Sequence, residues 1–591
     1  MRTNLTSLSY FEKWLVLGVL IGVAAGGSAT VFYFSIRFFE YVFLGTFVGA
    51  NVPHPVGEGG TLVFSYFVER PYLIPISVAA GGAVSGLLVY GFAPEAEGHG
   101  TDMAIEAYHN AQGKIRGRIP IIKMIASSFV IGSGGSAGRE GPTAQMSAGV
   151  GSVLAEFLHL SPSERRMAVA VGIGAGIGTI FKAPIGGAVL AAEVLYRRDL
   201  EPEVIFPSIV ASSVGYSIFA SIVGFEPIFG YYTEAFSVLR LPFYAVLGLA
   251  AGGLSTLYVR VFYGINSGFK KLGVPPHVKP MIGGLVTGLI ALVFPEVMTT
   301  GYGWVQLIIS GKLQSLVGGG LPIIFILALL PFIKIIATSM SVGSGGSGGV
   351  FAPGMVIGAC LGGLLGLVFH ILFPGVVPSV APFAIIGMLS FFGAAGKVPL
   401  SVILMVVEMT GSLQLLPAAM LATAISYTVS GLKYSIYRSQ VNTRRDSPAH
   451  MGEYNTPLLS SIRVSEIGLR NLGVRPEEAV ENAIKTMNDL KLFSLPVIDG
   501  DRFVGVVYLD QIVNKGGQVS SFTEKGASYV EPTSTADQAW DVMMKNRTMW
   551  CPVVDKGKYL GMVTLGDLLE YYRAKESVLK EGRLQDDSTR L

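Results

Sequence analysis

Only two cysteines, Cys360 and Cys551, occur among the 591 residues, and they lie far apart in the chain. Such a pair provides no disulfide framework and no cysteine-based metal cluster. The net charge is only +3 at pH 7, so the composition does not indicate a nucleic-acid partner. The apolar part of the chain also lacks a nucleophile–base pair and a group of metal ligands, which argues against an enzyme.

Apolar residues, in contrast, make up 51% of the chain, and the mean hydropathy is +0.55. These values are too high for a soluble protein and predict an integral, multi-pass membrane protein in a lipid bilayer. The 76 glycines suit close helix packing and interrupted helices. The apolar runs near spanning length are 14–36, 72–92, 204–223, 241–263, 280–294, 321–336 and 354–373.

The composition changes to that of a soluble protein at residues 438–445, RSQVNTRR. We therefore predict a membrane domain at 1–445 and a second domain at 446–591. Basic residues beside the last apolar segment favour a cytoplasmic C-terminus, and Lys13 before the first run is consistent with a cytoplasmic N-terminus.

A glycine-rich stretch occurs twice in the membrane domain, as GSGGSAGREGP at 132–142 and as GSGGSGGVFAP at 343–353. Each copy ends in Gly-x-x-x-Pro before an apolar segment, a pattern that predicts a helix N-terminus. Helix N-termini favour anions because their amides are unpaired and the helix dipole is positive there. The two copies therefore predict two anion sites.

A second pair of segments repeats at nearly the same spacing, FKAPIGGAVLAAE at 181–193 and GKVPLSVILMVVE at 396–408. Two matches in the same order indicate an internal duplication. Inverted halves with a site at their interface are a common transporter arrangement, although the sequence alone does not establish the inversion.

The C-terminal domain has its own repeat, LPVIDGDRFVGVVYLDQI at 495–512 and CPVVDKGKYLGMVTLGDL at 551–568. Each copy reads as strand, turn, strand and helix, and each follows a helical stretch, at 476–490 or 536–545. The pattern predicts two small α/β modules packed on each other.

Glu140 is an ionisable residue inside the apolar zone, at one of the predicted helix entrances. Such a residue is costly in a membrane and marks a functional site by default. A carboxylate there can occupy the place of a transported anion, so that its protonation or displacement opens the path. It can also cap the helix or pair with Arg139, and these roles are compatible.

The motifs GREGP at 138–142 and GVFAP at 349–353 resemble the signature pair of the CLC family of chloride channels and proton/chloride exchangers. The C-terminal repeat resembles paired CBS modules, here at about 462–517 and 523–578. The resemblance implies an all-α polytopic membrane domain of two inverted repeats with broken and re-entrant helices, followed by a cytoplasmic α/β CBS pair. It also implies a homodimer with one anion path in each subunit.

Carried over residue by residue, the resemblance makes Glu140 the gating glutamate. The amides of Val350 and Phe351 match those that bind the central anion, and Tyr434 best matches the tyrosine that closes the inner side, with Tyr437 as the alternative. A tyrosine near a membrane end can also be an interfacial anchor. The implied anion-binding set is His99, Gly138, Arg139, Gly141, Gly349, Val350, Phe351, Ala352 and Tyr434.

Two positions depart from the family pattern. His99 stands where the family has an anion-binding serine; its imidazole can donate one N–H or become positively charged, or it can face away from the path. Val194 stands at the inner proton-relay position of the exchangers, and valine carries no proton. The neighbouring Glu193, like Glu408, reads as a structural acid satisfied by helix ends or basic neighbours.

The segment Gly561 to Asp567 resembles the nucleotide-binding form of the CBS motif, in which Thr564 and Asp567 contact the nucleotide. The first copy has Tyr508 and Gln511 at those positions, so at most one good site for an adenine nucleotide is implied. Regulation by ATP, ADP or AMP and a purely structural CBS pair are both open.

The sequence therefore predicts a CLC-type chloride channel or uncoupled transporter that is gated by a glutamate and requires no cofactor, with chloride as the transported ion. The alternative is a proton/chloride antiporter of the same family. A more distant alternative is a specialist for fluoride or nitrate.

Overall fold

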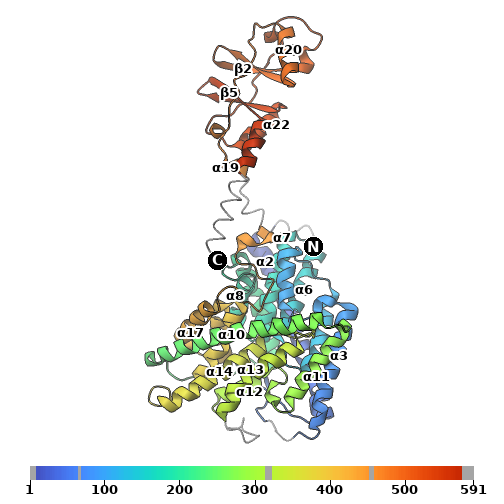
Figure 1. The fold of residues 1–591 in the computed structure, drawn as a ribbon, viewed down its shortest axis with the longest axis vertical. Helices are drawn as coiled ribbons and strands as arrows, with labels where there is room; N and C mark the ends of the chain where they lie inside the picture. The colour runs from blue at the N-terminus through green and yellow to red at the C-terminus, as the bar shows by residue number, and fades with distance from the viewer. Residues whose placement is uncertain (1–7, 64–67, 313–322, 451–457, 576–591) are drawn as a thin grey trace. The chain divides into compact units, whose positions relative to one another are not determined.

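The computed structural model describes residues 8–63, 68–312, 323–450 and 458–575. The chain divides into two compact units, Met1–His450, which we call unit 1, and Met451–Leu591, which we call unit 2. Unit 1 is helical, and unit 2 contains small β-sheets together with helices (Figure 1).

Within the described residues, unit 1 contains two series of α-helices, α2 to α9 and α10 to α17. The first series is α2 (Tyr10–Glu40), α3 (Ile74–Phe92), α4 (Thr101–Asn110), α5 (Arg118–Gly132), α6 (Glu140–Phe157), α7 (Pro162–Ile180), α8 (Pro184–Glu193) and α9 (Ile205–Val223). The second is α10 (Leu241–Lys271), α11 (Lys279–Ala291), α12 (Tyr302–Ile309), α13 (Ile323–Ser341), α14 (Phe351–Leu372), α15 (Ala381–Gly396), α16 (Pro399–Thr410) and α17 (Leu416–Ser430). Each series begins with a 31-residue helix.

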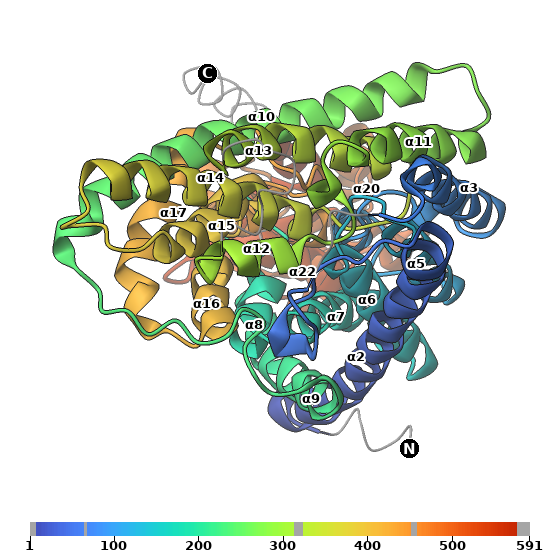
Figure 2. The ribbon, with the colours of Figure 1, turned by 90° about the horizontal axis from the view of Figure 1, so that it is seen from below.

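The packing of the two series is also the same. Helix α6 packs on α7 and α2 packs on α9, just as α14 packs on α15 and α10 packs on α17. Figure 2 shows α2 and α10 on opposite sides of unit 1, with α6, α7, α12 and α15 between them. Equivalent helices make equivalent contacts, so the duplication predicted from the sequence is confirmed by the arrangement of the elements.

Helices α8 and α16 begin in the same way. Lys182 and Lys397 adopt a left-handed backbone with φ of 52° and 58°, and Pro184 and Pro399 follow at the first helical position. Proline fits that position because its ring fixes a helical φ and its missing N–H is not needed there.

Glu193 in α8 and Glu408 in α16 each accept hydrogen bonds from the first amides of the other helix. The four bonds run from Leu400 N and Ser401 N to Glu193 Oε1 and Oε2 (2.9 and 2.8 Å), and from Ile185 N and Gly186 N to Glu408 Oε1 and Oε2 (2.8 and 2.7 Å). A carboxylate near the end of one helix thus caps the start of the other, in both directions. Such reciprocal contacts require antiparallel helices related by an approximate two-fold axis, so the two series run in opposite directions.

In the part of the chain that the structure describes, seven segments are long and apolar enough to cross a membrane: Tyr10–Val48, Pro71–Phe92, Pro202–Val223, Val238–Lys271, Ile323–Ser341, Phe351–Leu372 and Leu413–Ser430. Six of them correspond to apolar runs in the sequence. The predicted run at 280–294 instead contains α11, whose 13 residues are too few to span a bilayer. The last span was missed because small and polar residues lower its hydropathy to 1.3.

Unit 2 has two similar modules. The strands are β1 (Ser494–Asp499), β2 (Arg502–Tyr508), β3 (Glu524–Lys525), β4 (Trp550–Asp555) and β5 (Lys558–Thr564), and the helices are α19 (Leu458–Ser461), α20 (Val480–Leu490), α21 (Leu509–Ile512) and α22 (Ala536–Asn546). The hairpins β1–β2 and β4–β5 have the same antiparallel register, and each shifts at the same point. The predicted order of helix, strand, turn, strand and helix is confirmed in both copies, with residues 565–575 helical after β5.

We expect Glu193→Ala and Glu408→Ala each to lower the free energy of unfolding by about 1–2 kcal/mol, because each removes the cap of a helix start. The measurement is the thermal unfolding midpoint of the purified protein in detergent. Glu203→Ala is the matched control, since Glu203 is exposed. Equal midpoints for all three variants would contradict the reciprocal caps.

Candidate anion site

The starts of α6 and α14 meet in the interior of unit 1. The two glycine-rich loops before them pair through a reciprocal bridge, in which Gly138 N donates to Gly349 O (2.7 Å) and Gly349 N donates to Gly138 O (2.6 Å). A Cβ added to Gly349 would lie 2.9 Å from Gly138 O, so the approach needs glycine. The two helix N-termini predicted from the sequence therefore lie together, and their positive dipole ends converge.

Glu140 is fully buried at this junction. Its Oε2 accepts a hydrogen bond from the backbone amide of Ala352 (3.3 Å), in the first turn of α14, and its Oε1 accepts one from the hydroxyl of Tyr302. The carboxylate of one repeat thus lies at the helix N-terminus of the other. An anion at that position would find the same donors.

Arg139 is held mainly by Glu58 and only loosely by Glu140. Its guanidinium makes two hydrogen bonds to the Glu58 carboxylate, one of them from Nη1 to Oε2 at 3.1 Å, whereas its Nε is 3.9 Å from Glu140 Oε1. It also lies over the rings of Tyr33 and Tyr302, at 5.5 and 5.4 Å from their centroids. The Arg139 charge is therefore largely neutralised by Glu58.

Phe351, at the first position of α14, lies in an aromatic cluster. Its ring stacks on Phe392 with centroids 3.7 Å apart and packs against Phe181 at 4.7 Å. The carbonyl of the preceding Val350 accepts a hydrogen bond from Tyr258 (3.1 Å). These contacts fix the start of α14, whose Val350 and Phe351 amides remain the predicted anion donors.

His99 is buried against the same two loops. Its neighbour Gly98 bonds to the second loop through Gly346 O and Gly348 N (both 3.1 Å), and a Cβ at Gly141 would lie 2.0 Å from His99 O. Among the described residues, His99 Nδ1 has no hydrogen-bond partner. The position fits the predicted anion-binding set.

Tyr437, and not Tyr434, lies beside His99. The Tyr437 ring is buried, with its centroid 5.5 Å from that of His99. Tyr434 accepts a hydrogen bond from Arg260 (2.7 Å) and lies under its guanidinium. The alternative tyrosine considered from the sequence is therefore the one that the fold brings to the site.

Val194 follows the last residue of α8 and is buried. Its carbonyl accepts a hydrogen bond from Gln440 Nε2 (3.0 Å), so its backbone has a structural partner. The neighbouring Glu193 carboxylate caps α16, as described above, and is also bonded to the hydroxyl of Ser401.

The sequence reasoning missed several residues that build this site. Lys123 and Lys334 are buried and donate to carbonyls of the segments before α4 and α12, Lys123 to Gly98 O (2.6 Å) and Lys334 to Val297 O (2.8 Å). Both stand nine residues before a glycine-rich copy, at Gly132 or Gly343, so extending the repeat backwards would have found them. No comparable repeat in the sequence points to Glu58 or Tyr302.

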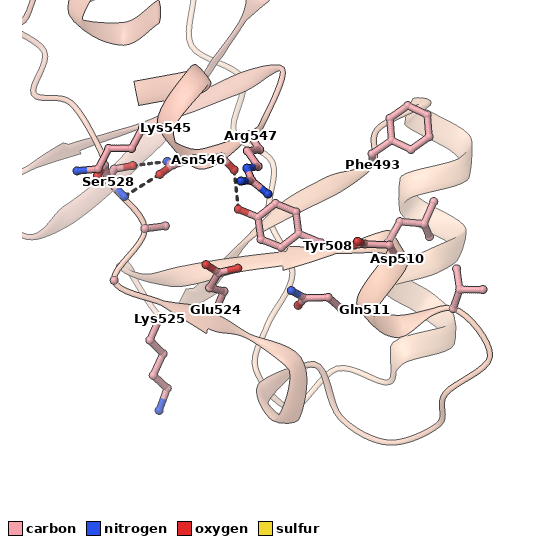
Figure 3. A pocket seen from close by; sticks show the side chains of 14 residues that line it. Phe493, Tyr508, Asp510, Gln511, Glu524, Lys525, Ser528, Lys545, Asn546 and Arg547 are labelled. Atoms are coloured by element: carbon pink, nitrogen blue, oxygen red, sulfur yellow. Dashed lines mark hydrogen bonds between the residues drawn. The ribbon is translucent and has the colours of Figure 1, made fainter. Parts of the chain in front are cut away.

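Unit 2 contains a cavity of about 1040 Å³ beside the first module. Tyr508 of β2 and Gln511 of α21 line it on one side, and Lys545, Asn546 and Arg547, at the end of α22, line it on the other (Figure 3). The hydroxyl of Tyr508 donates to Asn546 O (2.7 Å). Burial, and after it the Glu524 carboxylate, raises the pKa of Tyr508 above its ordinary value.

The predicted nucleotide residues Thr564 and Asp567 lie together in the second module, where Thr564 Oγ1 donates to Asp567 Oδ2 (2.5 Å). Arg470 Nε and Nη2 also donate to the Asp567 carboxylate, at 2.9 Å to Oδ2 and 2.6 Å to Oδ1. Partial burial raises the pKa of Asp567 and these bonds lower it, with a net pKa below the ordinary value. The carboxylate is therefore already engaged.

Comparison with known proteins identifies both parts. The family model described as voltage gated chloride channel matches residues 81–431, and the CBS domain model matches 464–516 and 519–574. The chain is 29% identical to the voltage-gated ClC-type chloride channel ClcB of Salmonella typhimurium, covering 72% of this chain and 98% of the relative. It is 25% identical to chloride channel protein CLC-f of Arabidopsis thaliana, covering 96% of this chain and 70% of the relative.

Solved structures share the fold. A slow cyanobacterial Cl⁻/H⁺ antiporter aligns with a TM-score of 0.60 at 22% identity, over 72% of this chain and 96% of the other. A eukaryotic CLC transporter aligns over 94% of this chain and 98% of the other, with a TM-score of 0.56 at 17% identity.

Proposed function

Because the chain belongs to the family of voltage-gated chloride channels and carries two CBS domains, we propose that it conducts chloride passively across a membrane, with Glu140 as its gate. The observation that carries the proposal is the position of the Glu140 carboxylate, which is buried at the start of α14 and bonded to the Ala352 amide. A chloride ion and a carboxylate compete for the same donors there.

The gate follows from this competition. While Glu140 is ionised, its carboxylate occupies the anion-binding site between the two helix starts and blocks it. Protonation removes the negative charge that the helix dipoles favour, so the side chain is released and chloride takes its place. Arg139 can remain in position throughout, since Glu58 holds its guanidinium. Beyond the gate, the ion then passes His99 and Tyr437, whose rings lie side by side.

The valine at position 194 supports passive conduction, because it stands where the exchangers of the family have a proton-relay acid. A proton that crosses an apolar interior needs titratable groups or water along its way. Val194 provides no such group, and the Glu193 carboxylate is occupied by the amides of α16. The alternative is antiport, the activity named for the solved cyanobacterial relative.

We further propose a homodimer with both termini in the cytoplasm. The basic residues at 438–445, beside the last membrane span, support this orientation under the positive-inside rule. The CBS pair then lies on the cytoplasmic side, where adenine nucleotides are available to it.

For unit 2 we propose regulation by an adenine nucleotide such as ATP, ADP or AMP, bound in the cavity beside the first module. Its volume of about 1040 Å³ leaves room for a ligand of this size. Lys525, Lys545 and Arg547 line it and suit phosphate groups. At the Thr564–Asp567 motif, in contrast, Arg470 already holds the carboxylate that a ribose would need.

Glu140→Gln resembles the protonated side chain, so we expect it to raise chloride flux severalfold at neutral pH and to remove the pH dependence of that flux. The measurement is chloride efflux from liposomes containing the purified protein between pH 4.5 and 7.5. Glu203→Gln, at an exposed glutamate, is the control. Loss of flux in a folded Glu140→Gln variant would show that Glu140 is structural.

We expect a chloride gradient across liposomes to drive little or no uphill proton movement. We also expect Val194→Glu alone not to install tight coupling, because the rest of a proton path would still be missing. Chloride and proton fluxes recorded together on the same liposomes check both statements. Uphill proton pumping by the unmodified protein, at a fixed ratio to chloride, would show that the protein is an antiporter.

Arg547→Ala should weaken ATP binding to the full chain by about tenfold, because a phosphate loses a charged hydrogen-bond donor. Asp567→Asn should leave the affinity unchanged, since Arg470 already occupies that carboxylate. Isothermal titration of the detergent-solubilised protein measures both affinities. The opposite result, in which only Asp567→Asn weakens binding, would assign the nucleotide to the Thr564–Asp567 motif.

A further inference from the structure

We propose that the Tyr302 hydroxyl is a shared donor at the gate: it holds the Glu140 carboxylate in the closed state and donates to the transported anion once Glu140 has withdrawn. This inference rests on the proposed function, because it assigns a further anion-binding residue to the same site.

Tyr302 is held in position by the turn before it and by Lys334. It opens α12 directly after Gly301, whose φ of 81° turns the chain into the helix. Lys334 Nζ donates to the carbonyls of Val297 (2.8 Å) and Thr299 (3.4 Å), in the segment that leads to this turn. Because the charge of Lys334 is buried, its bonds to these carbonyls fix the segment and with it the position of Tyr302.

The ring of Tyr302 is enclosed on several sides. Phe229 packs edge-on against it with centroids 5.8 Å apart, Phe181 lies at 6.5 Å, and the Arg139 guanidinium lies over the ring at 5.4 Å. The side chain is 1% exposed. Since the ring is fixed, its hydroxyl remains directed at the place that the Glu140 carboxylate occupies.

The donors around Glu140 define an anion-binding site with one donor from α14 and one from α12. The Ala352 amide donates from α14 to Oε2, and the Tyr302 hydroxyl donates from α12 to Oε1. A buried donor without an acceptor is costly, so removal of the carboxylate leaves two donors that require a replacement. Chloride can accept hydrogen bonds from both donors. The hydrogen bond of the Tyr302 hydroxyl therefore changes its acceptor, from the Glu140 carboxylate to the ion.

The two-fold relation between the repeats supports a pore-lining role for this position. In the first repeat, the 3₁₀ helix Pro94–Ala96 leads to Gly100 and Thr101 at the start of α4; in the second, Pro295–Val297 leads to Gly301 and Tyr302 at the start of α12. Gly100 and Gly301 have similar φ values, 85° and 81°. The first of these segments carries His99, so both repeats bring the equivalent turn to the site.

The test uses Tyr302→Phe in the full-length protein, which removes only the hydroxyl. In the otherwise unmodified protein we expect chloride flux at neutral pH to rise severalfold, because Glu140 is held less firmly. In the Glu140→Gln background we expect the Kd for chloride, measured by isothermal titration, to increase about tenfold, the loss typical of a hydrogen bond to a charged group.

Tyr244→Phe is the matched control, since Tyr244 is also buried in unit 1 but its ring stacks on Phe383 and it makes no hydrogen bond to Glu140. An unchanged Kd for Tyr302→Phe in the Glu140→Gln background would overturn the inference. Failure of Glu140→Gln alone to raise flux would instead overturn the proposed function, so the two failures are distinguishable.

A second measurement covers the case in which Tyr302→Phe does not fold. A Glu140→Gln chain with 3-fluorotyrosine at position 302 is titrated with chloride, and its fluorine NMR signal is followed. We expect a saturable shift at the Kd found by calorimetry. A signal that does not move while calorimetry reports binding would overturn the inference.

Discussion

The mutual hydrogen bonds of Gly138 and Gly349 are the constraint on which the rest of the membrane unit depends. Because each amide donates to the other residue's carbonyl, two loops from opposite halves of the chain lie in direct backbone contact, which leaves no room for a side chain. That contact brings the starts of α6 and α14 together. A glutamate at the start of one helix thereby lies beside an amide of the other.

Among the described residues around this contact, the buried charges differ in the partners that they have. Arg139 is neutralised by Glu58, and Lys123 and Lys334 are satisfied by backbone carbonyls. Glu140, in contrast, accepts hydrogen bonds from a backbone amide and a hydroxyl. Both donors are uncharged, and both can also donate a hydrogen bond to a free anion. The positive charges are therefore held by a carboxylate or by carbonyls, whereas the Glu140 carboxylate is held by uncharged groups, as the proposed gate requires.

Much of this arrangement could be predicted from the sequence, because it lies in local patterns. The repeated glycines and prolines specify the helix starts, and the two matched segments specify the duplication. The choice between Tyr434 and Tyr437 could not be made, since both lie in an irregular segment whose side-chain directions follow no period. Glu58, in the 3₁₀ helix Val56–Glu58, and Tyr302, at the start of α12, come from distant parts of the chain, and only the packing of whole helices brings them to the site.

The reciprocal caps of α8 and α16 also affect the order in which the protein can be completed during synthesis. Helix α8 is made first, and its opening amides lack their carboxylate until Glu408 has been added to the growing chain. Until then the first half has an unfinished helix start. Its final packing has to wait for the second half, so each half supplies the other with a part that it cannot provide for itself.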